Sequence, residues 1–290
     1  MELLINEENN LIRSIYDSRE NYIVVDSKLC SENRCIIFFS GNGLYFPDTI
    51  EEFEKTIIEK DRYEWKTIGL SEEIKKHYKR IVFVRDVYKT WYEKGISKDI
   101  DSIDKLIDLL RNVCAGYSVV TCGNSAGGYI ATIIGNELQA EHIWNFGGQW
   151  TVETRFKDSF IHDNSVLKYY DIRSYANSNV LYFYGACCER DVEQYNTIKD
   201  SNAIMMPIKS EYHGDYVFNR CLYTLLGMDE KQIQKLIELF SKRVTDQRRY
   251  AFHILKGRAL IAELWKDIVR HHKSLQILCN IFRPLSKEGI

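Results

Sequence analysis

The chain has 290 residues, of which 45% are hydrophobic and 28% charged, and 39 Lys and Arg against 41 Asp and Glu leave a formal net charge of −2. This length supports one large domain with its own core, and the balanced charge does not favour a general nucleic-acid-binding protein. No signal peptide, bilayer-length apolar run or zinc-type CxxC pair is found in the sequence, so we expect a reduced, cytoplasmic protein without a metal site or required cofactor.

Seven short β-branched or aromatic runs alternate with amphipathic stretches along the first 227 residues. The expected strands are YIVVD (22–26), CIIFFS (35–40), IVFVRD (81–86), YSVVTC (117–122), HIWNFG (142–147), VLYFYG (180–185) and AIMMPI (203–208). Nearly continuous apolar strands separated by helices predict a doubly wound α/β domain, with a mostly parallel sheet covered on both faces. Beyond this point the pattern becomes helical. We therefore expect a domain of residues 1–227 and a helical extension of residues 228–290 that is free to pack on the same domain.

The fourth expected strand runs directly into Gly123-Asn124-Ser125-Ala126-Gly127, which fits the pattern G-x-S-x-G, and a helical stretch follows. In a nucleophile elbow, a serine sits on a sharp strand-to-helix turn and projects its hydroxyl from the sheet edge. Side chains two residues before and after the serine would collide with this turn, which explains the two glycines. The alternative is a purely structural turn. A phosphate-binding loop is poorly supported, because no Gly-Lys-Ser/Thr follows.

A second glycine-rich loop, Ser40-Gly41-Asn42-Gly43, follows the second expected strand. In hydrolases with a nucleophile elbow, such a loop supplies one backbone N–H to an oxyanion hole, and the residue after the serine supplies another. The expected donors are therefore Gly41 or Asn42, together with Ala126. An ordinary turn remains the alternative for this loop.

The acid and the base of a catalytic triad are expected after the last two strands of the domain, because the triad order in this type of hydrolase is Ser, then Asp or Glu, then His. Asp191 follows VLYFYG and is the preferred acid, placed to cap the helix VEQYNTI, with Glu189 as the second choice. His213 follows AIMMPI and stands beside Gly214, outside any apolar periodicity. The remaining histidines fall on helical or strand patterns.

With these motifs in this order, residues 20–226 resemble the α/β-hydrolase superfamily. The combination of FFSGNG, FVRDVYKTWYEKGI, TCGNSAGGYIATIIG, NFGGQW and HGD is similar to α/β-hydrolase-type proteins encoded with bacterial capsule and lipopolysaccharide genes, some of which are O-acetyltransferases or deacetylases. This resemblance implies a substrate-binding region near the third strand and the NFGGQW segment. The residues it implies are Arg85, Trp91, Tyr92, Gln149 and Trp150. For Trp91 and Tyr92, internal packing is an equal alternative.

The expected function is acyl transfer through Ser125, either as an esterase or deacetylase or as an O-acyltransferase acting on a bacterial surface polysaccharide. The substrate is a small ester or thioester, and acetyl-CoA is the expected donor for a transferase. The alternative is a catalytically silent accessory protein in glycan assembly or export.

The end of the chain is basic, with nine Lys and Arg against three acids from 248 to 290, a local net charge of +6. Leu260, Leu264 and Ile268 recur at helical spacing and give one apolar face. This face either packs on the core or contacts an anionic membrane surface or glycan. The second case would make the protein peripheral at the inner membrane.

Overall fold

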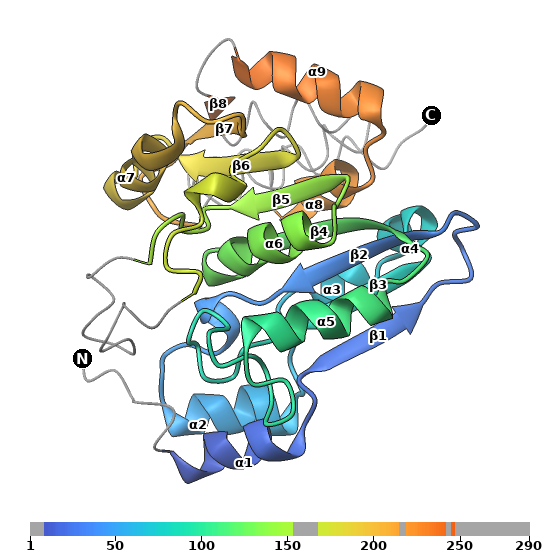
Figure 1. Ribbon diagram of the computed structural model, residues 1–290, viewed down its shortest axis with the longest axis vertical. Helices are drawn as coiled ribbons and strands as arrows, with labels where there is room; N and C mark the ends of the chain where they lie inside the picture. The colour runs from blue at the N-terminus through green and yellow to red at the C-terminus, as the bar shows by residue number, and fades with distance from the viewer. Residues whose placement is uncertain (1–8, 153–167, 215–218, 242–244, 247–290) are drawn as a thin grey trace, which may run out of the picture.

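The computed structural model describes residues 9–152, 168–214, 219–241 and 245–246. Its centre is an eight-stranded sheet in the order β1-β3-β2-β4-β5-β6-β7-β8 (Figure 1). The strands are β1 (Tyr22–Asp26), β2 (Arg34–Phe39), β3 (Arg80–Val84), β4 (Ser118–Asn124), β5 (His142–Phe146), β6 (Val180–Gly185), β7 (Ile204–Lys209) and β8 (Thr245–Asp246). All seven predicted runs form strands, and β8 is an eighth that the sequence does not predict.

The sheet is mostly parallel. β1 pairs antiparallel with β3, and every other pairing is parallel, from β3–β2 through to β7–β8. Parallel neighbours require crossover connections, which the intervening helices supply. The predicted doubly wound, mostly parallel α/β sheet is therefore confirmed.

Helices cover both faces of this sheet. They are α1 (Asn10–Ser18), α2 (Ile50–Phe53), α3 (Lys66–Gly69), α4 (Glu72–His77), α5 (Ile103–Val113), α6 (Ala126–Glu137), α7 (Glu189–Ile198), α8 (Asn219–Leu226) and α9 (Glu230–Ser241). In Figure 1, α5 and α6 lie in front of the sheet, and α3, α4 and α8 lie behind it. Residues 49–60, one of the amphipathic stretches of the sequence, form α2 followed by a π-helical turn, η3 (Glu54–Glu59).

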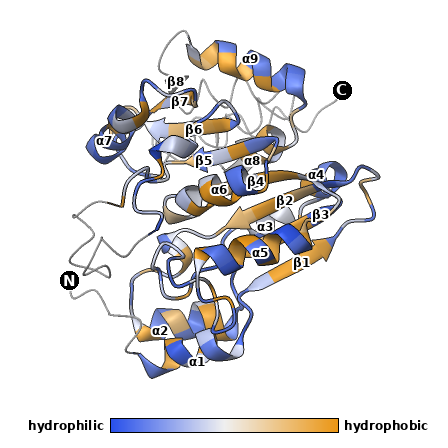
Figure 2. Ribbon diagram, in the orientation of Figure 1, coloured by the Kyte–Doolittle hydropathy of each residue, from blue (hydrophilic) through white to orange (hydrophobic). Residues whose placement is uncertain are grey.

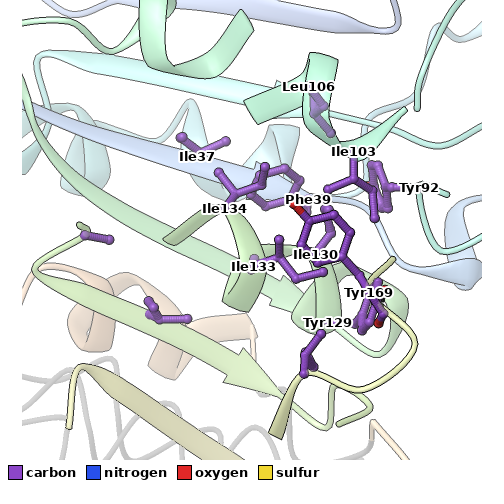
Figure 3. Packing of buried hydrophobic residues seen from close by; sticks show 14 of the residues in the cluster. Ile37, Phe39, Tyr92, Ile103, Leu106, Tyr129, Ile130, Ile133, Ile134 and Tyr169 are labelled. Atoms are coloured by element: carbon purple, nitrogen blue, oxygen red, sulfur yellow. Dashed lines mark hydrogen bonds between the residues drawn. The ribbon is translucent and has the colours of Figure 1, made fainter. Parts of the chain in front are cut away.

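The two faces bury separate clusters, because alternate residues of each strand point to opposite sides. Figure 3 shows part of the front cluster, in which Ile37 and Phe39 of β2 pack with Ile130 and Ile134 of α6. In Figure 2 the strands are hydrophobic along most of their length, whereas α5 shows one polar side. This difference is expected when strands are covered on both faces and surface helices on one.

The first part of the predicted extension is continuous with the domain. Ile233, Leu236 and Phe240 of α9 are buried in the cluster behind the sheet, and β8 pairs with the edge strand β7. The basic region from 248 to 290 lies outside the described residues.

Candidate active site

The turn between β4 and α6 has the geometry of a nucleophile elbow. Ser125 has φ of 55° and ψ of −121°, a left-handed backbone conformation that is strained for a residue with a side chain. A Cβ at Gly123 would stand 2.1 Å from the Gly127 carbonyl oxygen, and one at Gly127 would stand 2.4 Å from the Phe39 oxygen. Neither position accommodates a side chain, which confirms the steric explanation for these two glycines. The turn is braced by the Ser125 N–H, which donates to Phe146 O at 2.9 Å.

Three side chains that follow three different strands, β4, β6 and β7, form a continuous hydrogen-bonded chain. His213 Nε2 lies 3.0 Å from Ser125 Oγ, and His213 Nδ1 lies 2.6 Å from Asp191 Oδ1. The second oxygen of Asp191 accepts the Gly185 N–H at 2.8 Å, so the carboxylate is held from both sides. The Asp191 side chain is 2% exposed and the His213 side chain 20% exposed. A nucleophile, a base and an orienting acid thus stand in the geometry that general-base catalysis requires.

Of the two carboxylates that the sequence leaves as the acid, Asp191 is the one beside His213. Glu189 is exposed at the first position of α7. The helix also begins earlier than predicted: Cys188 precedes its first residue, so Asp191 lies inside the first turn rather than capping a later helix. Placement inside the turn directs its carboxylate back toward the end of β6, where Gly185 donates to it.

The loop that carries His213 is fixed by short local contacts. Ser210 Oγ accepts the Tyr212 N–H at 3.2 Å and donates to Tyr212 O at 3.1 Å. Gly214, directly after the histidine, has φ of +82°, a conformation that glycine adopts without strain. A Cβ there would stand 3.5 Å from the side-chain amide of Asn124, the residue before Ser125. The histidine loop and the elbow are therefore in contact.

The structure distinguishes between the two predicted oxyanion donors of the first loop. The Gly41 N–H already donates to Glu64 Oε2 at 2.6 Å. Within the described part of the chain, the N–H groups of Asn42 and Ala126 donate to no protein acceptor. Both open helical turns, η2 (Asn42–Leu44) and α6, where such N–H groups are left unpaired. Of the expected donors, Asn42 and Ala126 thus have an N–H without a protein acceptor among the described residues, whereas the N–H of Gly41 is taken.

The five residues expected to bind substrate are all buried: Arg85, Trp91, Tyr92, Gln149 and Trp150. Arg85 forms an ion pair with Asp61 at 2.9 Å, and Trp91 Nε1 donates to Gln149 Oε1 at 3.0 Å. Tyr92 donates its hydroxyl to Ser40 O at 2.8 Å. Arg85, Trp91, Tyr92 and Gln149 are thus buried and bonded within the protein, whereas the buried Trp150 Nε1 has no hydrogen-bond partner among the described residues. Their contact with substrate stays a prediction.

Glu64 is a further residue of the site to which no sequence motif points. It lies in the short segment between η3 and α3, at no periodic position, and only the fold brings it to the loop after β2. Burial raises the pKa of its carboxyl group above the usual value, although the Gly41 N–H, Arg62 and Lys89 act in the opposite direction.

Among the residues that the structure describes, no group of three or more His, Cys, Asp or Glu side chains converges on a possible metal site. None of the helices in the same residues combines the length and apolar character needed to cross a membrane.

Comparisons with known proteins leave the family open. No protein-family model matches the sequence, and a search of curated proteins gives no match. Among solved structures, a Staphylococcus aureus Mu50 protein of unknown function has 12% identity over 76% of this chain and 94% of its own, with a TM-score of 0.49. The capsule O-acetyltransferase of Neisseria meningitidis serogroup A has 11% identity over 76% of this chain and 92% of its own, with a TM-score of 0.45. An esterase from Pyrobaculum calidifontis has 9% identity over 87% of this chain and 92% of its own, with a TM-score of 0.41.

The mostly parallel sheet, the strained serine turn after β4, and Asp191 and His213 placed after β6 and β7 in that chain order are the features of the α/β-hydrolase fold. The chain has this fold.

Proposed function

We propose that this protein is a serine-dependent acyl-transfer enzyme with Ser125 as its nucleophile. The observation that carries the proposal is the pair of hydrogen bonds that joins Ser125 Oγ to His213 at 3.0 Å and His213 to Asp191 at 2.6 Å. Ser125 also stands on a strained turn, which the surrounding structure must hold in place, and such strain is typical of functional sites.

In the proposed mechanism, His213 Nε2 takes the proton from Ser125 Oγ as the oxygen attacks an ester or thioester carbonyl. Asp191 keeps the proton on Nδ1 and stabilises the imidazolium that forms. The Asn42 and Ala126 N–H groups hold the oxyanion of the tetrahedral intermediate, and each such donor is worth about 3–4 kcal/mol. His213 then returns the proton to the leaving group, and an acyl-Ser125 intermediate remains.

The acceptor of the acyl group determines the class of enzyme. Water yields an esterase or deacetylase, and a sugar hydroxyl yields an O-acyltransferase, for which acetyl-CoA is the donor we propose to test. A bacterial surface polysaccharide is the acceptor suggested by the sequence resemblance.

A fluorophosphonate probe tests the proposal, because it reacts only with an activated serine. We expect the wild-type protein to be labelled at Ser125, as located by peptide mass spectrometry, and to hydrolyse p-nitrophenyl acetate. Ser125→Ala should abolish labelling and lower kcat by several orders of magnitude with an unchanged melting temperature, whereas Ser14→Ala, at an exposed position of α1, should behave as wild type. A wild-type protein that is folded but unreactive would overturn the proposal in favour of a silent accessory protein.

The two acceptors are separated by incubating the wild-type protein with acetyl-CoA, with and without candidate glycans. Free CoA that appears only when a glycan is present, together with an acetylated glycan, identifies a transferase. Release of acetate at an equal rate in both samples identifies a hydrolase.

A further inference from the structure

Hydrogen bonds from other segments hold the end of β2 and the loop that follows it at successive residues. Trp65 Nε1 donates to Phe39 O at 2.8 Å, at the last residue of the strand. One residue later, Ser40 O accepts the Tyr92 hydroxyl at 2.8 Å. These bonds hold the strand end and the first carbonyl of the loop, one from the residue that precedes α3 and one from the loop after β3.

Glu64 forms hydrogen bonds with the next two polar groups of the same loop, the Ser40 hydroxyl and the Gly41 N–H. Its backbone N–H donates to Ser40 Oγ at 3.3 Å, and its carboxylate Oε2 accepts the Gly41 N–H at 2.6 Å. Its second oxygen, Oε1, would stand 3.8 Å from a Cβ at Gly43, so the carboxylate lies along the whole glycine-rich turn. Asn42 is the first residue of the loop whose N–H has no protein acceptor within the described residues.

Gly41 is held between this carboxylate and the nucleophile elbow. A Cβ at Gly41 would stand 2.5 Å from the Asn124 carbonyl oxygen and 3.7 Å from Glu64 Oε2. The Gly41 backbone thus touches the residue before Ser125 on one side and is bonded to Glu64 on the other. A shift of Gly41 would therefore change the distance between the Asn42 N–H and Ser125.

Keeping a carboxylate here has a thermodynamic cost. Burial raises the pKa of Glu64, and no salt bridge to Glu64 is found in the described part of the chain. Glu64 is partly buried, and a carboxylate shielded from water whose one strong hydrogen bond goes to a backbone N–H is unfavourable compared with an apolar side chain. A charge-assisted bond to that N–H is, however, short and strong, which suits the positioning of a loop.

We propose that Glu64 is the positioning residue of the oxyanion hole. Its carboxylate holds the Gly41 peptide group so that the Asn42 N–H, together with that of Ala126, faces the carbonyl oxygen of a substrate bound at Ser125. This inference rests on the proposed function. Glu64 takes no part in proton transfer, and its role requires a hydrogen-bond acceptor at this place.

Three substitutions of Glu64 distinguish this positioning role from a need for its negative charge and from a purely structural role. Glu64→Gln keeps an acceptor of the same length and should retain kcat for p-nitrophenyl acetate within about threefold. Glu64→Ala removes the acceptor and Glu64→Asp withdraws it by one methylene. Both should lower kcat, with Ala losing about 10²–10³-fold, while KM changes little, because an oxyanion donor acts chiefly in the transition state. Glu73→Ala, at an exposed carboxylate of α4, is the control and should match wild type.

The outcomes are distinct. Rescue by Gln together with a loss confined to kcat supports the positioning role. If Glu64→Gln loses as much as Glu64→Ala, the charge itself is needed and the inference is wrong. If both Ala and Asp keep wild-type kcat, or lower only the melting temperature, it is also wrong. Should Glu64→Ala fail to fold, the contrast between Asp and Gln decides. Failure of the proposed function itself would be visible earlier, as a wild-type protein that neither reacts with the fluorophosphonate nor hydrolyses the ester.

Discussion

Replacing Asp191 with Asn tests the triad with almost no change in shape. In the wild-type protein, Oδ1 accepts from His213 Nδ1 at 2.6 Å, and Oδ2 accepts from the Gly185 N–H at 2.8 Å. Asn offers one acceptor and one donor group in place of these two acceptors. The amide must therefore present its NH₂ group either to His213 or to Gly185.

The two orientations have different costs. With the oxygen toward Gly185, the NH₂ group donates to His213 Nδ1, so the neutral ring carries its proton on Nε2. A protonated Nε2 cannot accept the proton of Ser125. With the oxygen toward His213, two donors face each other across 2.8 Å, and the buried Gly185 N–H loses its acceptor at a cost of about 1–3 kcal/mol. The first orientation is favoured, and neither carries the charge that stabilises the imidazolium. The expected loss in kcat is thus about 10³–10⁴-fold, close to that known for a triad aspartate changed to asparagine.

The assay is the steady-state hydrolysis of p-nitrophenyl acetate, with thermal melting as a check on folding. The melting temperature should change little, because the favoured orientation leaves both buried partners hydrogen-bonded. Glu189→Gln, at the exposed carboxylate two residues earlier, is the matched control and should keep wild-type activity. Activity of Asp191→Asn within tenfold of wild type would refute the reasoning, as would a larger loss in Glu189→Gln.

Three further predictions concern stability and the end of the chain. Gly128→Ala should lower the free energy of unfolding by roughly 1–3 kcal/mol or more, because its Cβ would meet Asn145 Oδ1 at 2.7 Å; unchanged denaturant unfolding would contradict this. Burial raises the pKa of Glu93 to about 7, above its unfolded value, so stability should fall as the pH rises from about 4.5 to 7, by up to about 3 kcal/mol. Glu93→Gln should flatten this dependence in urea titrations, and an equal slope in both proteins would exclude Glu93 as its source. Deleting residues 247–290 should leave ester hydrolysis intact and abolish binding to anionic liposomes, whereas insoluble protein would show that this region belongs to the core.

Much of the fold is predictable because it depends on local pattern. The seven runs predicted as strands are short, apolar and bounded by turns, and burial of such runs on both faces leaves few alternatives to a parallel sheet. β8 was not predicted because a strand of two residues shows no periodicity in the sequence. It exists only because β7 offers an unpaired edge beside it.

The chemistry of the site is partly local and partly not. Ser125 could be recognised because an elbow needs glycines at fixed offsets, a steric requirement of the turn itself. Asp191 and His213 follow from chain order, since the carboxyl ends of parallel strands meet at one edge of the sheet. The choice of Asp191 over Glu189 needed the structure, because the start of α7 decides which carboxylate turns inward.

The sequence by itself determined the sheet, the elbow and the three residue types that converge on it, since each is encoded within a few neighbouring positions. Only the tertiary structure decided which backbone N–H groups and side chains are available to contact a substrate. The Gly41 N–H is taken by Glu64, which is 23 residues away along the chain, and the aromatic residues that resemble a binding surface are buried. Whether a polar group is free or satisfied depends on partners brought together from distant segments, and the local pattern of a sequence does not contain them.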